Sequence, residues 1–101
     1  MAEFQKVTTV DELSPGQCLT AVVNNRYVAV FNVDGTFHAT DGSCPHQAGL
    51  LGNGKLNGCV VTCPEHGFRF DVTTGVMPGG GLSVKKCEVK VEGGEVFVAV
   101  E

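Results

Sequence analysis

The sequence lacks the features of several large classes of protein. No apolar run approaches the roughly 18 residues that a membrane helix needs, so we expect no membrane span. The opening residues 1–6 contain no charged-then-apolar leader. The net charge of −4 is the wrong sign for a nucleic-acid partner and favours docking to a protein with a positive patch.

Tryptophan is absent and tyrosine occurs once, whereas glycine occurs 14 times in 101 residues. This composition favours short strands and many turns over a helical bundle. Hydrophobic residues make up 43% of the chain, which is enough for one core. We therefore predict a single domain over residues 1–101. The five cysteines are odd in number and do not have the spacing of a secreted disulfide framework, so we expect a cytoplasmic protein.

Strand-like segments flank a loop-rich insert. Residues 4–40 and 82–101 alternate in polarity or carry short apolar runs, and we expect them to pack as a small antiparallel β-sandwich or barrel. Residues 41–80 are rich in glycine and proline, with a core too small to hold its own shape, so a metal site would complete it. The fold class is therefore all-β with an inserted metal-binding subdomain.

Local patterns add four turns and one helical turn. Asn24-Asn25 and Gly93-Gly94 predict turns, and Asp34-Gly35 and Asn57-Gly58 predict two-residue hairpins, the first because both of its central positions need positive φ. Thr9 and Glu12 have the spacing of a capping box, which predicts one helical turn. Residues 18–23 are apolar at most positions, which predicts a strand buried on both faces.

Two short sequence motifs contain the candidate metal ligands. Cys44-Pro45-His46 and Cys63-Pro64-Glu65-His66 each offer one thiolate and one imidazole on a rigid loop, and sixteen residues separate His46 from Cys63. Such ligands select zinc, iron or an iron–sulfur cluster over calcium or magnesium. We predict Cys44, His46, Cys63 and His66 as the metal ligands.

Two kinds of centre fit these ligands. One is a closed tetrahedral zinc site, although zinc fingers usually pair Cys with Cys and His with His. The other is a two-iron cluster in which one iron takes both cysteines and the other takes both histidines. The mixed order of Cys and His in each loop favours the second.

The motif Cys44-x-His46…Cys63-x-x-His66-Gly67 resembles the Rieske 2Fe-2S signature. The likeness extends through Asp41-Gly42-Ser43, Phe68-Arg69-Phe70-Asp71 and the Pro78 loop, and it covers essentially the whole chain. It implies a Rieske fold with one 2Fe-2S cluster. It also implies that Cys44 and Cys63 hold the buried iron, while His46 and His66 hold the outer iron.

The sequence departs from the high-potential Rieske proteins at four positions. Gly49 and Glu65 stand where those proteins have a disulfide, and Phe68 and Phe70 stand where they have a serine and a tyrosine. Hydroxyl donors to the cluster sulfurs raise the potential. Their absence predicts the low end of the Rieske range of roughly −150 to +300 mV.

The resemblance implies a one-electron carrier between a flavoprotein reductase and the terminal oxygenase of a ring-hydroxylating or similar system. Alternatives are a small Rieske subunit of a nitrite-reductase-type enzyme and, from another class, a zinc-stabilised interaction module. No nucleophile–base pair, phosphate loop or paired carboxylates are evident, so we do not expect an enzyme that acts alone.

The remaining candidates have structural interpretations. Cys18, Cys59 and Cys87 lie in strand-like segments and are predicted to be small buried hydrophobes. His38 has no neighbouring cysteine and is taken as structural. Arg69 is predicted to be exposed, and Asp71 is predicted to cap the turn at residues 73–75. The Pro78 loop either shields the cluster from water or only reverses the chain.

Overall fold

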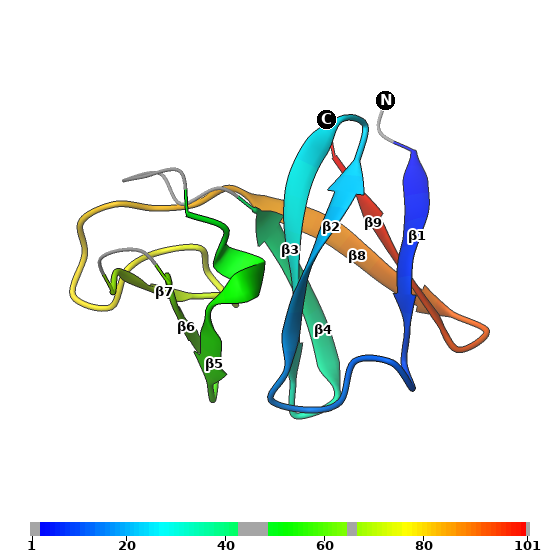
Figure 1. The fold of residues 1–101 in the computed structure, drawn as a ribbon, viewed down its shortest axis with the longest axis horizontal. Coiled ribbons are helices and arrows are strands. Elements are labelled where there is room, and N and C mark those ends of the chain that lie inside the picture. Colours follow the sequence, from blue (N-terminus) through cyan, green and yellow to red (C-terminus); the bar gives the residue numbers. More distant parts are fainter. Residues whose placement is uncertain (1–2, 43–48, 65–66, 101) are drawn as a thin grey trace.

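The computed structural model describes residues 3–42, 49–64 and 67–100 and forms two antiparallel sheets (Figure 1). The larger sheet has the order β1-β9-β8-β4-β3-β2, and the smaller has the order β5-β6-β7. Their strands are β1 (Phe4–Thr9), β2 (Cys18–Val23), β3 (Arg26–Val33), β4 (Thr36–Asp41), β5 (Lys55–Asn57), β6 (Val60–Thr62), β7 (Arg69–Asp71), β8 (Lys86–Glu92) and β9 (Glu95–Ala99). A short 3-10 helix, η1 (Leu51–Asn53), precedes β5. The all-β fold expected from the sequence is confirmed.

The larger sheet curls into a nearly closed barrel. Its two edge strands, β1 and β2, contact each other. The side-chain amide of Gln5 donates a hydrogen bond of 2.9 Å to the Asn24 side chain across this junction. The register of β1 against β9 shifts between Lys6 and Thr8, a bulge-like irregularity that increases the local bend of a strand. These contacts cover the sheet edges that an open sheet would expose.

Tight hairpin turns follow the chemistry of their residues. Asn24 and Asn25 have φ of 52° and 62°, and Asp34 and Gly35 have φ of 51° and 91°. Both turns therefore lie in the left-handed region that asparagine, aspartate and glycine enter at low cost. Gly93 and Gly94 also have positive φ. The hairpin predicted at Asn57-Gly58 joins β5 to β6, although the turn itself lies at Gly58 and Cys59.

Strand β3 is buried on both faces and joins the two halves of the molecule. Its residues Val28 and Val30 pack inside the barrel with Val96 and Val98. The alternate residues Ala29 and Phe31 pack under the smaller sheet. Because side chains alternate between the two faces of a strand, this one strand contributes to both cores.

Two local predictions were wrong. The strand expected to be buried on both faces, residues 18–23, forms the edge strand β2, and within it only Val23 is buried. The helical turn expected at Thr9 and Glu12 is a hydrogen-bonded turn instead: Glu12 N donates to Thr9 O at 3.2 Å. The Thr9 hydroxyl meets the Glu12 carboxylate at 3.1 Å, where a capping box would place it on a backbone amide.

Candidate metal centre on two closed loops

Each predicted ligand pair lies in a loop whose ends are joined by a backbone hydrogen bond. The first loop, residues 42–51, is closed by Leu51 N donating to Gly42 O at 2.8 Å. The second loop, residues 63–68, is closed by Cys63 N donating to Phe68 O at 2.6 Å. In the sequence, Cys44 and His46 fall between Gly42 and Leu51, while Cys63 is the first residue of the second loop and His66 falls between Cys63 and Phe68.

Cys63 is the predicted ligand that the structure describes. It follows β6 directly, and only 1% of its surface is exposed. It shares a buried cluster with Leu51, Val61 and Phe70. A thiol in this position is shielded from water, as the predicted inner iron ligand requires.

The other three predicted ligands, Cys44, His46 and His66, lie outside the described residues. Within the ranges 3–42, 49–64 and 67–100, no three His, Cys, Asp or Glu side chains form a metal-binding group. Gly49 and Glu65 stand at the two positions where high-potential Rieske proteins have a disulfide. Gly49 is buried, and Glu65 lies outside the described residues.

The bases of the two loops are packed together. Leu51 ends the first loop and Cys63 begins the second, and both belong to the same buried cluster. A Cβ placed on Gly54 would collide with Thr62 O, the residue before Cys63. A Cβ placed on Gly52 would collide with Leu19 O. The segment after the first loop therefore fits between β2 and β6 because its glycines lack side chains.

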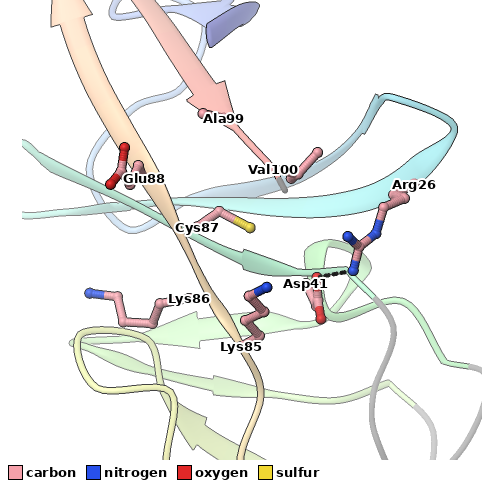
Figure 2. Close-up of a pocket in the computed structure, with 8 residues that line it drawn as sticks. All are labelled: Arg26, Asp41, Lys85, Lys86, Cys87, Glu88, Ala99 and Val100. Carbon is pink, nitrogen blue, oxygen red and sulfur yellow. Dashed lines mark hydrogen bonds and ion pairs between the residues drawn. The ribbon is translucent and has the colours of Figure 1, made fainter. Parts of the chain in front are cut away.

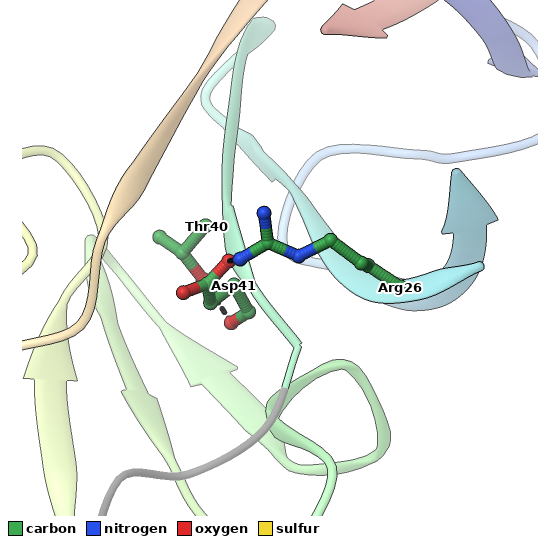
Figure 3. Close-up of polar contacts among 3 residues, drawn as sticks. All are labelled: Arg26, Thr40 and Asp41. Atoms are coloured by element: carbon green, nitrogen blue, oxygen red, sulfur yellow. Dashed lines mark hydrogen bonds and ion pairs between the residues drawn. The ribbon is translucent and has the colours of Figure 1, made fainter. Parts of the chain in front are cut away.

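The root of the first loop is held by the start of β3. Gly42 N donates to Tyr27 O at 2.8 Å, and Asp41 N donates to Lys85 O at 2.8 Å. The Arg26 guanidinium lies 3.4 Å from the Asp41 carboxylate, and the Thr40 hydroxyl donates to Asp41 O at 3.0 Å (Figure 3). Sequence reasoning did not identify the roles of Tyr27, Gly42 and Leu51, because these contacts depend on long-range pairing.

The turn after β7 is organised by Asp71, as the sequence predicts. Its Oδ1 accepts hydrogen bonds from Thr73 N at 2.9 Å and from the Thr73 hydroxyl at 2.6 Å. These bonds hold the pKa of Asp71 below its usual value. The Asp71 backbone also forms a bridge with Val76, which in turn bridges Ser83.

The Pro78 loop lies between those bridges. Met77 N donates to Leu82 O at 3.2 Å, and Gly80 N donates to Met77 O at 2.9 Å. The Met77 side chain packs against the cluster that contains Cys63. The loop therefore reverses the chain and also covers part of the core beneath the second loop.

Three other described cysteines, Cys18, Cys59 and Cys87, lie outside the predicted ligand set. Cys18 Sγ donates to Gly54 O at 3.5 Å, and burial raises the pKa of its thiol. Burial likewise raises the pKa of Cys87, which is half-buried in a pocket of about 180 Å³ beside Arg26 and Lys85 (Figure 2). Cys59 lies in the β5–β6 turn, not in a strand as predicted. Cys18 and Cys87 are thus partly buried neutral thiols, as expected for structural cysteines.

The antiparallel barrel, the smaller sheet and the two hydrogen-bonded loop bases define a small all-β protein in which one predicted ligand, Cys63, is buried at a loop base. The sequence profile of the Rieske [2Fe-2S] domain matches residues 3–81. The chain belongs to the Rieske [2Fe-2S] domain family. The predicted cofactor, a Rieske 2Fe-2S cluster, is confirmed over the zinc alternative.

Two similar proteins indicate which kind of Rieske protein this chain resembles. The chain is 39% identical to the ferredoxin subunit of biphenyl dioxygenase from Pseudomonas sp. (strain KKS102) over 98 residues, covering 94% of this chain and 90% of that protein. It resembles the ferredoxin of carbazole 1,9a-dioxygenase from Nocardioides aromaticivorans IC177 with a TM-score of 0.90 and 30% identity, covering 97% and 98% of the two chains.

Two other solved structures bear on the partners. A chain in a complex of reduced oxygenase and oxidized ferredoxin of carbazole 1,9a-dioxygenase matches with a TM-score of 0.87 and 34% identity, covering 95% of this chain and 92% of that one. A putative nitrite reductase small subunit from Mycobacterium tuberculosis matches with a TM-score of 0.88, covering 100% and 97%, but at 22% identity this likeness concerns the fold alone. In the described part of the chain, no helix is long and apolar enough to cross a membrane.

Proposed function

We propose that this chain is the ferredoxin component of an oxygenase system, which takes single electrons from a flavoprotein reductase and passes them to a terminal oxygenase. The identity of 39% to a dioxygenase ferredoxin over nearly the full length of both chains carries this proposal. The chain is an electron-transfer component and not an enzyme that acts alone. The nitrite-reductase alternative rests on the shared fold, so it ranks second.

We infer the ligand set that the sequence predicts. Cys44 and Cys63 would hold one iron of the cluster, and His46 and His66 would hold the other. The burial of Cys63 and the closure of both loops at their bases support this assignment. A bound Rieske cluster supplies reversible one-electron chemistry.

The chain's own residues exclude water and fix the ligands. Cys63 is enclosed by apolar neighbours, so its thiolate lies in a region of low dielectric once the site is complete. Phe68 and Phe70 offer no hydroxyl to a nearby sulfur, and Phe70 is fully buried. Both features favour the less negatively charged, oxidised state and therefore a low reduction potential.

The domain organisation and location complete the proposal. Residues 1–101 form one Rieske domain, with base strands at about 4–40 and 82–101 and a cluster-binding subdomain at about 41–80. The division of strands between the two sheets supports these boundaries. A cytoplasmic location is supported by Cys18, Cys59 and Cys87, which form no disulfide with one another, as a reducing compartment would keep them.

The ligand assignment is tested with Cys63→Ser and the matched control Cys87→Ser. The purified wild-type protein should be red-brown, contain two irons per chain and give a Rieske-type EPR signal after reduction. Cys63→Ser should lose that signal, whereas Cys87→Ser should keep it, because Cys87 lines a separate pocket. Colourless wild-type protein with one zinc per chain would refute the proposal.

Transfer to a partner is tested by turnover. Holoprotein, a flavoprotein reductase and a terminal oxygenase from the same genome are mixed with NADH and an aromatic substrate. Product should form only when all three proteins are present, and the Cys63→Ser variant should not support it. Product formation at the same rate without the chain would contradict the assigned role.

A further inference from the structure

Strands β4 and β8 pair over only part of their length. The pairs are Ala39–Cys87 and Thr40–Lys86, and no further pair between the two strands forms in the described part of the chain. Strand β8 nevertheless continues through residues 88–92, each of them paired with β9 on its other side. Figure 1 shows β8 diverging from β4 over this stretch. Residues 88–92 therefore present an unpaired backbone edge, which we call the open edge.

An apolar groove of about 520 Å³ separates the open edge from the elements that face it. It is lined by Phe37 of β4, by Val10 and Pro15 between β1 and β2, and by Val89 and Val91 of the open edge. Val89 packs against the barrel core, whereas Val91, on the same face of the strand, is 49% exposed. An apolar side chain thus lies uncovered beside a row of unpaired backbone groups.

Charges alternate along the other face of the open edge. Glu88, Lys90 and Glu92 point away from the core, because side chains alternate across a strand. The side chains of Lys90 and Glu92 are 46% and 75% exposed, and their charged groups lie 3.7 Å apart. Charged residues commonly block a strand edge against other strands. An alternating pattern blocks only some registers, because a strand with the matching alternation meets opposite charges.

We propose that the open edge is a self-association surface, to which a second copy of this chain adds its own β8 antiparallel about a two-fold axis at Val91. In this register Lys90 of each chain lies opposite Glu92 of the other, and the two Val91 side chains meet on the groove side. Two opposite-charge pairs and one apolar pair form from residues that are exposed in the single chain. The surface lies on the barrel, so the inference does not depend on the proposed function.

Other two-fold registers of the open edge are less favourable. Pairing about Lys90 would oppose like charges at every outward position. Pairing about Val89 would continue onto Cys87, whose edge already pairs with Ala39. The register about Val91 matches opposite charges and avoids the segment of β8 that β4 occupies.

The charges around Glu92 favour a second cation. Its partner across the sheet on β9 is Glu95, a like charge that Lys6 holds at 3.0 Å. An ammonium from a second copy would offset the repulsion between these two carboxylates. In the single chain Lys90 lies over the Phe4 ring, 4.9 Å from its centroid. About half of the Lys90 side chain is exposed, so a change of rotamer can carry its ammonium over the open edge.

The paired segment is short, so the dimer should be weak. Interfaces that bury less than about 1,000 Å² are transient, and we expect a Kd between about 10 μM and 1 mM. Sedimentation velocity of the holoprotein, from about 5 μM to 2 mM, measures this constant. At an ionic strength of about 0.15 M, the net charge of −4 on each chain is screened beyond about 8 Å. A chain that sediments as a monomer over the whole range overturns the proposal.

Charge-swap variants separate this register from non-specific association. Lys90→Glu and Glu92→Lys should each raise the Kd about tenfold or more, because each brings like charges together across the axis. The double variant Lys90→Glu/Glu92→Lys restores both pairs and should return the Kd to within about threefold of the wild-type value. An equimolar mixture of the two single variants should form heterodimers at least as tight as the wild-type dimer, since every pair across the axis is then of opposite charge. Failure of both the double variant and the mixture to recover association overturns the proposal.

Matched controls make the same charge changes away from the axis. Glu3→Lys and Lys55→Glu alter exposed sites on β1's leading end and on the smaller sheet, and Glu88→Lys alters the open edge outside the paired segment. All three should keep the Kd within about twofold of the wild-type value. Glu88→Lys that weakens association as much as Glu92→Lys overturns the register about Val91. The mixture keeps the test decisive, because heterodimers form only if both single variants are folded.

Discussion

Gly42 is the position where a single added methyl group should do most damage to the first loop. A Cβ placed there would lie 2.7 Å from Tyr27 C and 2.9 Å from both Tyr27 Cβ and Tyr27 O. Two of these atoms belong to the backbone of β3, so no side-chain rotation relieves the clash. Gly42→Ala should therefore push the root of the loop away from β3.

The expected cost follows from what that displacement breaks. Overpacking costs about 1–3 kcal/mol. Stretching the hydrogen bonds from Gly42 N to Tyr27 O and from Leu51 N to Gly42 O costs about 0.5–1.5 kcal/mol each. A total of about 4 kcal/mol is a large part of the roughly 5–15 kcal/mol of a typical domain. It should lower the Tm by roughly 16–32 °C.

The assay compares Gly42→Ala with Gly58→Ala at one scan rate in a calorimeter, together with iron per chain. Gly58 has a positive φ of 63° but open space around its Cβ position, so its substitution costs only about 1 kcal/mol of backbone strain. Gly58→Ala should keep a full complement of iron, whereas Gly42→Ala should lose part of it. A Gly42→Ala protein with the Tm of the control and full iron would refute the reasoning.

Three further outcomes follow from the packing and the site. Protein-film voltammetry should give a reduction midpoint at the low end of the roughly −150 to +300 mV range. Phe70→Tyr should raise this midpoint if the new hydroxyl reaches a sulfur of the cluster. A clearly positive wild-type midpoint near neutral pH would contradict the expected low potential. Phe31→Ala should lower the free energy of unfolding by about 3–5 kcal/mol, measured by urea denaturation, because Phe31 is fully buried between β3 and the smaller sheet. Asp71→Ala should cost about 1–2 kcal/mol above pH 5 by leaving Thr73 without its acceptor. Since the folded pKa of Asp71 is lowered, this contribution is present above the unfolded pKa of about 3.9 and is lost as the pH falls through the folded value, so wild type and variant should converge in acid.

Local chemistry made the turns predictable. Positive φ at Asn24, Asn25, Asp34 and Gly35 depends on the residues themselves, so their sequence was sufficient. The cap at Asp71 is equally local, since its partner Thr73 is two residues away. Arg69 is exposed, as its alternation with two phenylalanines predicted.

Burial depended on neighbours that the sequence does not reveal. The apolar residues of β2 suggested a strand covered on both faces, yet β2 lies at the sheet edge and β3 takes the doubly covered place. An apolar run shows that a strand has a buried face but not its position in the sheet order. The error with Thr9 and Glu12 has a similar source, because a capping-box spacing also fits a single turn that no helix follows.

The ligand motif was readable because its chemistry is local, with each Cys and His a few residues apart. The surroundings of the ligands could not be predicted from the sequence. Gly42, Tyr27 and Leu51 come together through β3 pairing and through a loop closure, and none of them carries a distinctive side-chain signal. Of the predicted ligands, the structure describes Cys63, so the assignment of Cys44, His46 and His66 stays a prediction.

The position of β9 determines when the barrel can close during synthesis. Among the described strands β1 pairs with β9, and Phe4 aligns with Ala99. β1 is therefore synthesised long before β9, its neighbour in the sheet, and its edge faces water until β9 emerges. The smaller sheet is complete by Asp71, so a nascent chain can assemble the platform under its cluster loops while the barrel still has an open seam.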